Sequence, residues 1–398
     1  MMKGSKRIEK LRPAPFFKLI PVVQEVEKSG VSVIRMNIGQ PDIKTPSEFY
    51  EGISNFREET LEYVHSRGMD VLLESTIKYY EGYGIDFKSE EIIITQGASE
   101  AIIFALASIC DVGDEIIVPE PFYANYENFT DLLNINISPI VTSPVNNFAL
   151  PGINEFEKHI NDRTRAIMIS NPCNPTGRVY TAEELKTIVD IALKHDLFII
   201  SDEVYKEFVY PGYEYISMAS FEEVSDRVII LDSISKRYSC CGARIGSVAT
   251  KNKEIIRLMM KLAEARLSVA TIEQVGAAAL QDVEKTFISD TLEKYKRRRD
   301  LIVEWLSEID GVIYNIPEGA FYTIVKLPVN NSEDFVSWML KNIVIEGYSL
   351  FVAPASGFYS SDEHGVDEVR ISYCVDDEEV ILGMKILKKA LEKYKLRQ

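Results

Sequence analysis

The sequence predicts an α/β protein with a large domain on a mostly parallel seven-stranded sheet and a smaller α+β domain. Between about residues 92 and 250, short apolar runs alternate with helical segments, which is typical of strands buried on both faces of a sheet. After about residue 285 the pattern changes to a long charged helix followed by isolated strands. A chain of 398 residues is long enough for both parts.

Seven apolar runs supply the strands of the predicted large sheet. Most of them lack the two-residue alternation of a half-buried strand. Helical periods cover residues 99–109 and 182–195, and Thr181 followed by Glu184 is a capping-box pattern at the start of the second helix. The predicted strands are 92–95, 115–118, 135–141, 165–170, 198–201, 228–232 and 245–250.

The smaller domain is predicted to contain strands 321–327 and 369–374 and a closing C-terminal helix. We expect residues 1–45 to form an N-terminal arm and part of the small domain, 46–285 the large domain, and 286–398 the rest of the small domain. The basic run 294–300 lies at helical spacing between Glu293 and Glu304, so we interpret it as a solvated helix face.

Composition excludes several classes of function. The net charge of −17 argues against a nucleic-acid partner, which needs clustered Lys and Arg. The basic start is not followed by an apolar run of signal length, and no run approaches a membrane span, so we expect a cytoplasmic protein. Five cysteines without framework spacing are expected to be reduced thiols, and four scattered histidines predict no metal site.

Lys236 is the first residue expected to carry chemistry. It follows the predicted strand 228–232, and therefore lies at the carboxyl edge of the sheet, where ligands bind. Most lysines only solvate a surface, but Ser233 and Ser235 precede this one and Arg244 follows in the same tight segment. A lysine adds to an aldehyde, while hydroxyls and a guanidinium neutralise a phosphate. The segment therefore predicts a site for an aldehyde-bearing phosphate ester.

Asp202 and Tyr205 follow the predicted strand 198–201. A carboxylate at a strand end can cap the next segment or bind a metal. In a pyridoxal 5'-phosphate site it has a sharper role, because it favours the protonated ring nitrogen that makes the ring an electron sink. Tyr205 is then expected to reach the ring hydroxyl.

Two loops add binding groups. The run 171–177 contains two Asn-Pro steps and a Thr-Gly, which predict a rigid turn, and Asn174 can donate to the cofactor's ring oxygen. The strand-to-helix turn with Gly97, Ala98 and Ser99 offers backbone N–H groups to a phosphate. Either loop alone has an ordinary structural explanation.

Tyr123 and Arg370 complete the predicted site. An aromatic residue near a helix start is usually part of the core, yet in this company Tyr123 can cover the cofactor ring. Arg370 interrupts an apolar strand, so it must reach solvent or face an anion. A guanidinium binds a carboxylate in a planar two-bond fork, which suits the α-carboxylate of an amino acid.

In this order, the motifs resemble those of the fold-type I pyridoxal-phosphate enzymes, specifically the class I/II aminotransferases grouped with aspartate aminotransferase. The resemblance extends from Asn37 to Arg370, and the Asn-Pro-x-Asn-Pro-Thr-Gly and Ser-x-Ser-Lys patterns are highly specific together. It implies that Gly39 contacts substrate through its backbone. It also implies a homodimer in which Tyr63 reaches the neighbouring subunit's phosphate and Ser268 lies at the same interface.

The resemblance has departures that concern the substrate. The family commonly has Pro-Gly-Ser-x-Phe-Gly before the carboxylate arginine, where this chain has the run 353–359. The bacterial aspartate-specific branch has a lysine in the first phosphate loop, where this chain has Ser99. Its hydroxyl-bearing N-terminal positions are Ala14 and Phe16 here.

The expected reaction is transfer of an amino group from an L-amino acid to a 2-oxo acid such as 2-oxoglutarate, with aspartate or glutamate as the first expected donor. An aromatic or broad-specificity aminotransferase and a β-lyase on the same scaffold stay open as alternatives. A regulator that only binds the cofactor is discarded. Such regulators usually carry a basic winged-helix module ahead of this fold, and only about 30 residues precede the first motif here. Arg266, and after it Arg67, are candidates to read a distal carboxylate; alternatively, Arg266 is an exposed helix-end residue.

Overall fold

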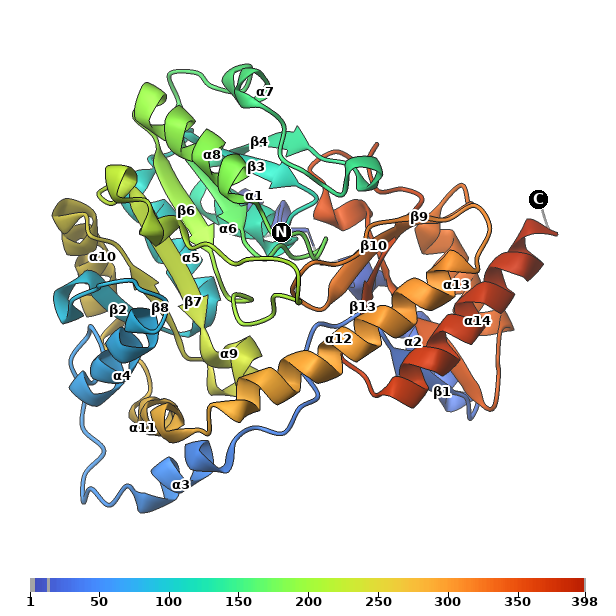
Figure 1. Ribbon diagram of the computed structural model, residues 1–398, viewed down its shortest axis with the longest axis horizontal. Helices are drawn as coiled ribbons and strands as arrows, with labels where there is room; N and C mark the ends of the chain where they lie inside the picture. Colours follow the sequence, from blue (N-terminus) through green and yellow to red (C-terminus); the bar gives the residue numbers. More distant parts are fainter. Residues whose placement is uncertain (1–3, 13–14, 397–398) are drawn as a thin grey trace.

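The computed structural model describes residues 4–12 and 15–396, and Figure 1 shows the arrangement of their helices and strands. The largest sheet has the order β2-β8-β7-β6-β5-β3-β4. β8 runs antiparallel to both neighbours, and the other adjacent strands are parallel. Its strands are β2 (Ile92–Thr95), β3 (Glu115–Glu120), β4 (Asn136–Val141), β5 (Thr164–Ser170), β6 (Phe198–Asp202), β7 (Val228–Ser233) and β8 (Gly246–Ala249). The seven predicted strands and the α/β fold are confirmed within the described residues.

The central strands are buried on both faces, which explains their continuous apolar runs. In β5, Ala166 and Met168 enter one hydrophobic core, whereas Ile167 and Ile169 enter the other. The first core also receives α5 (Gly97–Ile109), α6 (Asn125–Leu133) and α10 (Lys253–Arg266). The second receives α4 (Asp70–Glu81), α8 (Ala182–His195) and α11 (Thr271–Ala279). Shorter helices are α1 (Lys6–Glu9), α3 (Ser47–Asn55) and α7 (Ile153–Glu157).

The start of α8 confirms the predicted capping box. Thr181 Oγ1 accepts a hydrogen bond from Glu184 N at 3.2 Å, and Glu184 Oε2 accepts one from Thr181 N at 2.8 Å. The two side chains thereby satisfy N–H groups that the first helical turn leaves without an intrahelical partner.

The C-terminal part forms its own sheets and core. An antiparallel sheet has the order β12-β13-β10-β9, and β1 (Ser32–Arg35) pairs in parallel with β11 (Tyr348–Phe351). The antiparallel strands are β9 (Ile313–Tyr314), β10 (Tyr322–Lys326), β12 (Ala353–Pro354) and β13 (Glu368–Ser372). Four helices pack here: α2 (Ile20–Lys28), α12 (Thr286–Ser307), α13 (Ser332–Asn342) and α14 (Asp377–Lys395). N-terminal residues such as Val23 and Ile34 belong to this core, as Figure 1 also shows for α2 and β1. The proposed boundaries at residues 45 and 285 stay predictions.

The interpretation of the run 294–300 as a solvated face was wrong for Arg298. This side chain is buried, with both terminal nitrogens 2.7 Å from the Asp42 carboxylate and a further ion pair to Asp377. Arg297, its neighbour, is exposed. Helical periodicity therefore predicted correctly that Arg297 is exposed. It could not show that Asp42, from the N-terminal segment, lies against Arg298.

None of the described helices is long and apolar enough to cross a membrane. All five cysteines are free thiols. Within residues 4–12 and 15–396, no group of three or more His, Cys, Asp or Glu side chains is arranged to hold a metal ion.

Candidate active site

A cavity of about 400 Å³ lies at the carboxyl ends of three adjacent parallel strands. Ser170, Asp202 and Ser233, the last residues of β5, β6 and β7, line it. This is the edge at which open α/β sheets bind ligands. The predicted site residues in its lining are Gly39, Ala98, Ser99, Tyr123, Asn174, Asp202, Tyr205, Ser233, Ser235, Lys236, Arg244 and Arg370.

Lys236 lies on the single-turn helix α9 (Ile234–Arg237), directly after β7. Ser233 caps this helix by accepting a hydrogen bond from Ser235 N at 3.1 Å. Lys236 Nζ donates to Gly39 O at 2.7 Å and lies 4.0 Å from Cys241 Sγ. The chain therefore holds a primary amine in the cavity wall, where it can react with an electrophile.

Hydroxyls and a guanidinium gather beside the N-terminus of α5. Ser233 Oγ and Ser235 Oγ are 2.8 Å apart, and Arg244 Nη2 lies 3.5 Å from Gln96 O. Gly97 has φ +71°, and a Cβ there would lie 2.4 Å from Arg244 Nη2, so a side chain would fill the space that the guanidinium uses. The N–H groups and positive end of α5 add to this arrangement. Its chemistry suits a phosphate.

Asp202 is a buried carboxylate whose contacts leave it capacity for another partner. Tyr126 Oη donates to its Oδ2 at 2.7 Å, and Val204 N donates to its Oδ1 at 3.3 Å. Burial raises the pKa of Asp202 to about 6, against the lowering effect of the Tyr126 hydrogen bond. No cationic side chain within the described residues forms an ion pair with Asp202. A cationic ligand would therefore stabilise its ionised form.

Tyr205 and Asn174 form a polar layer with Tyr322. The hydroxyls of Tyr205 and Tyr322 are 2.9 Å apart, and Asn174 Nδ2 donates to Tyr205 Oη at 3.5 Å. Burial raises the pKa of Tyr205 well above its ordinary value, so this phenol stays a hydrogen-bond donor at neutral pH. Gly39 lies against the same layer, since a Cβ there would fall 1.6 Å from Tyr322 Oη.

Arg370 projects from β13 into the cavity between two aromatic rings. Its guanidinium carbon lies 4.6 Å from the centre of the Tyr322 ring and 4.7 Å from that of Phe358. Nη1 donates to Asn174 Oδ1 at 3.0 Å, and Nη2 donates to Asn37 O at 2.7 Å. No carboxylate of the described residues pairs with this cation, and buried Nε has no hydrogen-bond partner among them. The group can therefore receive an anionic ligand.

The family model for aminotransferase class I and II matches residues 31–384. This chain belongs to the class I and II aminotransferases. It is 32% identical over 399 residues to a probable aspartate/prephenate aminotransferase of Aquifex aeolicus, covering 98% of this chain and 100% of the relative. It is 31% identical to aromatic-amino-acid aminotransferase 2 of Thermococcus litoralis, covering 99% and 100%. A mutant aspartate aminotransferase of Thermus thermophilus has a TM-score of 0.90 at 25% identity, covering 98% and 100%.

Five residues considered for the candidate site do not line the cavity: Gly97, Tyr63, Ser268, Arg266 and Arg67. Tyr63 is 82% exposed, and Ser268 is half-buried just before α11. Arg266 ends α10, but it is not the exposed residue of the alternative interpretation: it bonds Ser66 O and Ile94 O and pairs with Glu100. Arg67 donates to backbone carbonyls near residue 90.

The residues of the candidate site that were not predicted from the sequence include three aromatic side chains, Tyr126, Tyr322 and Phe358. Tyr126 follows Tyr123 by three residues, in the first turn of α6, and that short spacing was the available signal. Tyr322 was assigned only to a strand, and nothing local distinguishes it from a core aromatic. Phe358 belongs to the run 353–359 that departs from the family pattern, and it does border the cavity as expected of that run. Ala14 and the Phe16 side chain lie outside the described part of the chain.

Proposed function

We propose that this aminotransferase holds pyridoxal 5'-phosphate in the cavity through Lys236 and transfers amino groups from an L-amino acid to a 2-oxo acid. The observation that carries the proposal is one cavity that contains a lysine amine, a buried carboxylate without a cationic partner among the described residues, and a cradle suited to phosphate. When bound, the cofactor supplies an aldehyde for covalent attachment and a conjugated ring that takes up an electron pair.

Each cavity residue has a task in this proposal. Ser233, Ser235 and Arg244 would hold the phosphate, with Gly97, Ala98 and Ser99 at the positive end of α5. Asp202 would hold a proton on the ring nitrogen, and Tyr123 would cover the ring. Asn174 and Tyr205 would donate to the ring oxygen. Lys236 Nζ would act as the base that takes the proton from the substrate Cα and as the acid that returns it in a 1,3-proton shift.

Arg370 would bind the α-carboxylate of the substrate, beside the backbone of Gly39. Its hydrogen bonds to Asn174 and Asn37 hold the guanidinium in place, and a guanidinium binds a carboxylate in a planar two-bond fork. Removing the guanidinium by an Arg370→Met substitution should therefore lower kcat/KM for every amino-acid donor.

Aspartate or glutamate is the first proposed donor, in keeping with the names of two of the similar proteins. A donor with an aromatic side chain is the second candidate, favoured by one observation. Lys236, Arg244 and Arg370 are the cations among the described lining residues, and each already has a proposed task. Phe17, Ile38 and Phe358 contribute apolar surface to the same lining. A distal carboxylate would then need a cation from outside this lining.

A donor panel with 2-oxoglutarate as acceptor tests the proposal. Purified enzyme should absorb as a bound pyridoxal-type chromophore, and each active donor should convert that absorbance in a half-reaction and release its own oxo acid. A higher kcat/KM for aspartate or glutamate supports the first candidate, and one for phenylalanine or tyrosine supports the second. Release of pyruvate and a thiol from cysteine-type donors without any acceptor would identify a β-lyase instead.

We further propose a cytoplasmic homodimer in which Tyr63 contributes to its partner's phosphate site. The exposure of Tyr63 supports this role, because a residue that serves a neighbouring subunit must lie at the surface of its own. Mixing Tyr63→Phe protomers with Lys236→Ala protomers tests it. A hybrid has one site with both lesions and one with neither, so activity should partly return. A verified heterodimer without recovery would contradict the shared site.

A further inference from the structure

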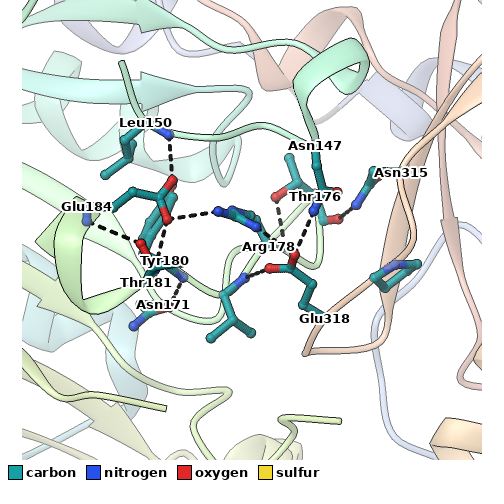
Figure 2. A network of polar contacts seen from close by, with 12 residues as sticks. Asn147, Leu150, Asn171, Thr176, Arg178, Tyr180, Thr181, Glu184, Asn315 and Glu318 are labelled. Carbon is teal, nitrogen blue, oxygen red and sulfur yellow. Dashed lines mark hydrogen bonds and ion pairs between the residues drawn. The ribbon is translucent and has the colours of Figure 1, made fainter. Parts of the chain in front are cut away.

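A buried carboxylate, Glu318, is bonded from three sides by the other half of the molecule (Figure 2). Arg178 Nη1 lies 2.6 Å from Glu318 Oε1, and Asn147 Nδ2 donates to the same oxygen at 2.6 Å. Val179 N donates to Glu318 Oε2 at 3.0 Å. Glu318 precedes β10, whereas its three partners belong to the loops around β4 and between β5 and α8. The Glu318 carboxylate therefore joins two segments that are far apart in the sequence.

Arg178 is fixed at its other end as well. Its Nη2 lies 2.8 Å from Glu184 Oε2, so the guanidinium is held between two carboxylates, as Figure 2 shows. Glu184 is itself held, because it caps α8 and its Oε1 accepts from Leu150 N at 2.8 Å. The side chains of Arg178 and Glu318 are only 11% and 4% exposed, so water screens this pair weakly.

Backbone contacts fix the register of the same two segments. Glu318 N and Gly319 N both donate to Gly177 O, at 2.8 and 2.9 Å. Asn315 Nδ2 donates to Thr176 O at 2.7 Å. Gly177 has φ +71°, and a Cβ there would lie 2.6 Å from Tyr322 O, so only glycine permits this approach.

Both segments carry groups that contact Arg370. Asn174, three residues before Gly177, accepts the hydrogen bond from Arg370 Nη1, and Tyr322, four residues after Glu318, places its ring over the guanidinium. A shift of either segment would move one of these contacts and not the other. The relative position of Asn174 and Tyr322 therefore depends both on the backbone bonds to Gly177 and on the side-chain bonds that Glu318 makes.

We propose that Glu318 and Arg178 are positioning residues that hold Asn174 and Tyr322 in register, so that Arg370 is aimed at the substrate α-carboxylate. This inference rests on the proposed role of Arg370. Loss of the Glu318 charge leaves Arg178 its ion pair with Glu184, so the guanidinium is not left buried without a partner. The effect of that loss should therefore appear in the binding of substrate carboxylates more than in folding.

Glu318→Gln tests the inference because it keeps the shape and removes the charge. It should raise KM for amino donors about 10- to 50-fold and leave kcat within about threefold. The Kd of an unreactive carboxylate, succinate or 3-phenylpropionate according to the preferred donor, should rise by the same factor. Asp114→Asn is the control. It removes the 2.9 Å ion pair between Asp114 and Arg165, which lies at the amino ends of β3 and β5, away from the cavity, and it should leave KM and Kd unchanged.

A double-mutant cycle decides whether Glu318 acts through Asn174. In an Asn174→Ala background, Glu318→Gln should raise KM by less than about a further twofold, because the Asn174 side chain through which Glu318 acts is already absent. Full additivity, or a Glu318→Gln enzyme with wild-type KM and Kd, would overturn the inference. If Glu318→Gln does not fold, Asn147→Ala removes one bond to the same carboxylate and should raise KM about threefold; an unchanged KM there overturns the inference too. A wild-type enzyme without transaminase activity would contradict the proposed function instead.

Discussion

Two groups of buried or half-buried charged side chains lie side by side on the same segments of this chain and have opposite surroundings. The cavity contains Asp202 and Lys236. The ion cluster, which we define as Lys206, Glu207, Asp232 and Arg237, contains residues adjacent to or near them in sequence. In the ion cluster, Asp232 lies 2.9 Å from Lys206 and 2.7 Å from Arg237. Burial alone would raise the pKa of Asp232, but Arg237 and Lys206 lower that pKa to about 2.

In the cavity, by contrast, burial raises the pKa of Asp202 to about 6, and no cation of the described residues pairs with this carboxylate to offset the effect. In the ion cluster, the charge of Asp232 is offset by those of Lys206 and Arg237, whereas burial raises the pKa of Glu207 to about 8. Charges in the cavity lack such partners within the described residues, and the protein gains their stabilisation only when a ligand supplies it. A buried charge alone therefore does not indicate a functional site; a buried charge without an ion-pair partner does.

The largest effect is expected from Asp232→Asn. The substitution leaves Lys206, whose side chain is fully buried, and Arg237 without their shared carboxylate. Breaking a buried ion pair in this way should lower the free energy of unfolding by about 3–5 kcal/mol. Urea unfolding of the cofactor-free protein at pH 7.5 measures it. A loss below about 1 kcal/mol would show that the ion cluster does not stabilise the fold.

The same substitution in the cavity, Asp202→Asn, should raise the free energy of unfolding of the cofactor-free protein, whereas Asp232→Asn should lower it. Between about pH 4 and 6 the unfolded carboxyl ionises while folded Asp202, with its pKa of about 6, keeps its proton, so wild-type stability falls as pH rises. The penalty reaches up to about 3 kcal/mol above pH 6, and the asparagine variant lacks it.

Urea unfolding of both proteins from pH 4 to 7.5 checks this prediction. The free energy of unfolding of the variant should equal that of the wild type near pH 4 and should exceed it by a growing amount up to pH 6. A difference that does not change with pH would contradict the origin assigned to it. Transaminase activity of the variant should fall under all these conditions, because Asp202 can no longer hold the ring proton.

The contrast between the two groups also shows how far sequence reasoning extends. Strands, the capping box of α8 and eleven cavity residues follow from local patterns, because apolar runs and strand-end residues are placed by the sheet itself. Gly39 follows from the family resemblance alone. Lys236 and Arg237 are adjacent, and no local pattern tells that one faces the cavity and the other the ion cluster. Arg298 and Tyr322 acquire their partners from distant segments, so their burial could not be read from their neighbours.

The smallest effect is expected at Arg266, a cation that lies outside the cavity and already has partners. Arg266→Ala should lower stability by about 1–2 kcal/mol, since Ser66 O, Ile94 O and Glu100 lose a donor. It should change the ratio of kcat/KM for aspartate and phenylalanine by less than about twofold. Steady-state kinetics with both donors measure that ratio. A selective loss above tenfold for aspartate would make Arg266 the reader of the side chain after all.

Borohydride reduction of the purified enzyme, followed by peptide mapping, tests the role of Lys236 most directly. If Lys236 attaches the cofactor, the wild-type protein is yellow, reduction abolishes its visible absorbance, and the pyridoxyl label appears on the peptide that contains Lys236. Lys236→Ala should carry no reducible label and should lose at least about 10⁴-fold in activity, because it lacks both the attachment point and the base. A reducible protein-bound cofactor in Lys236→Ala, or a wild-type label on another lysine, would contradict the assignment.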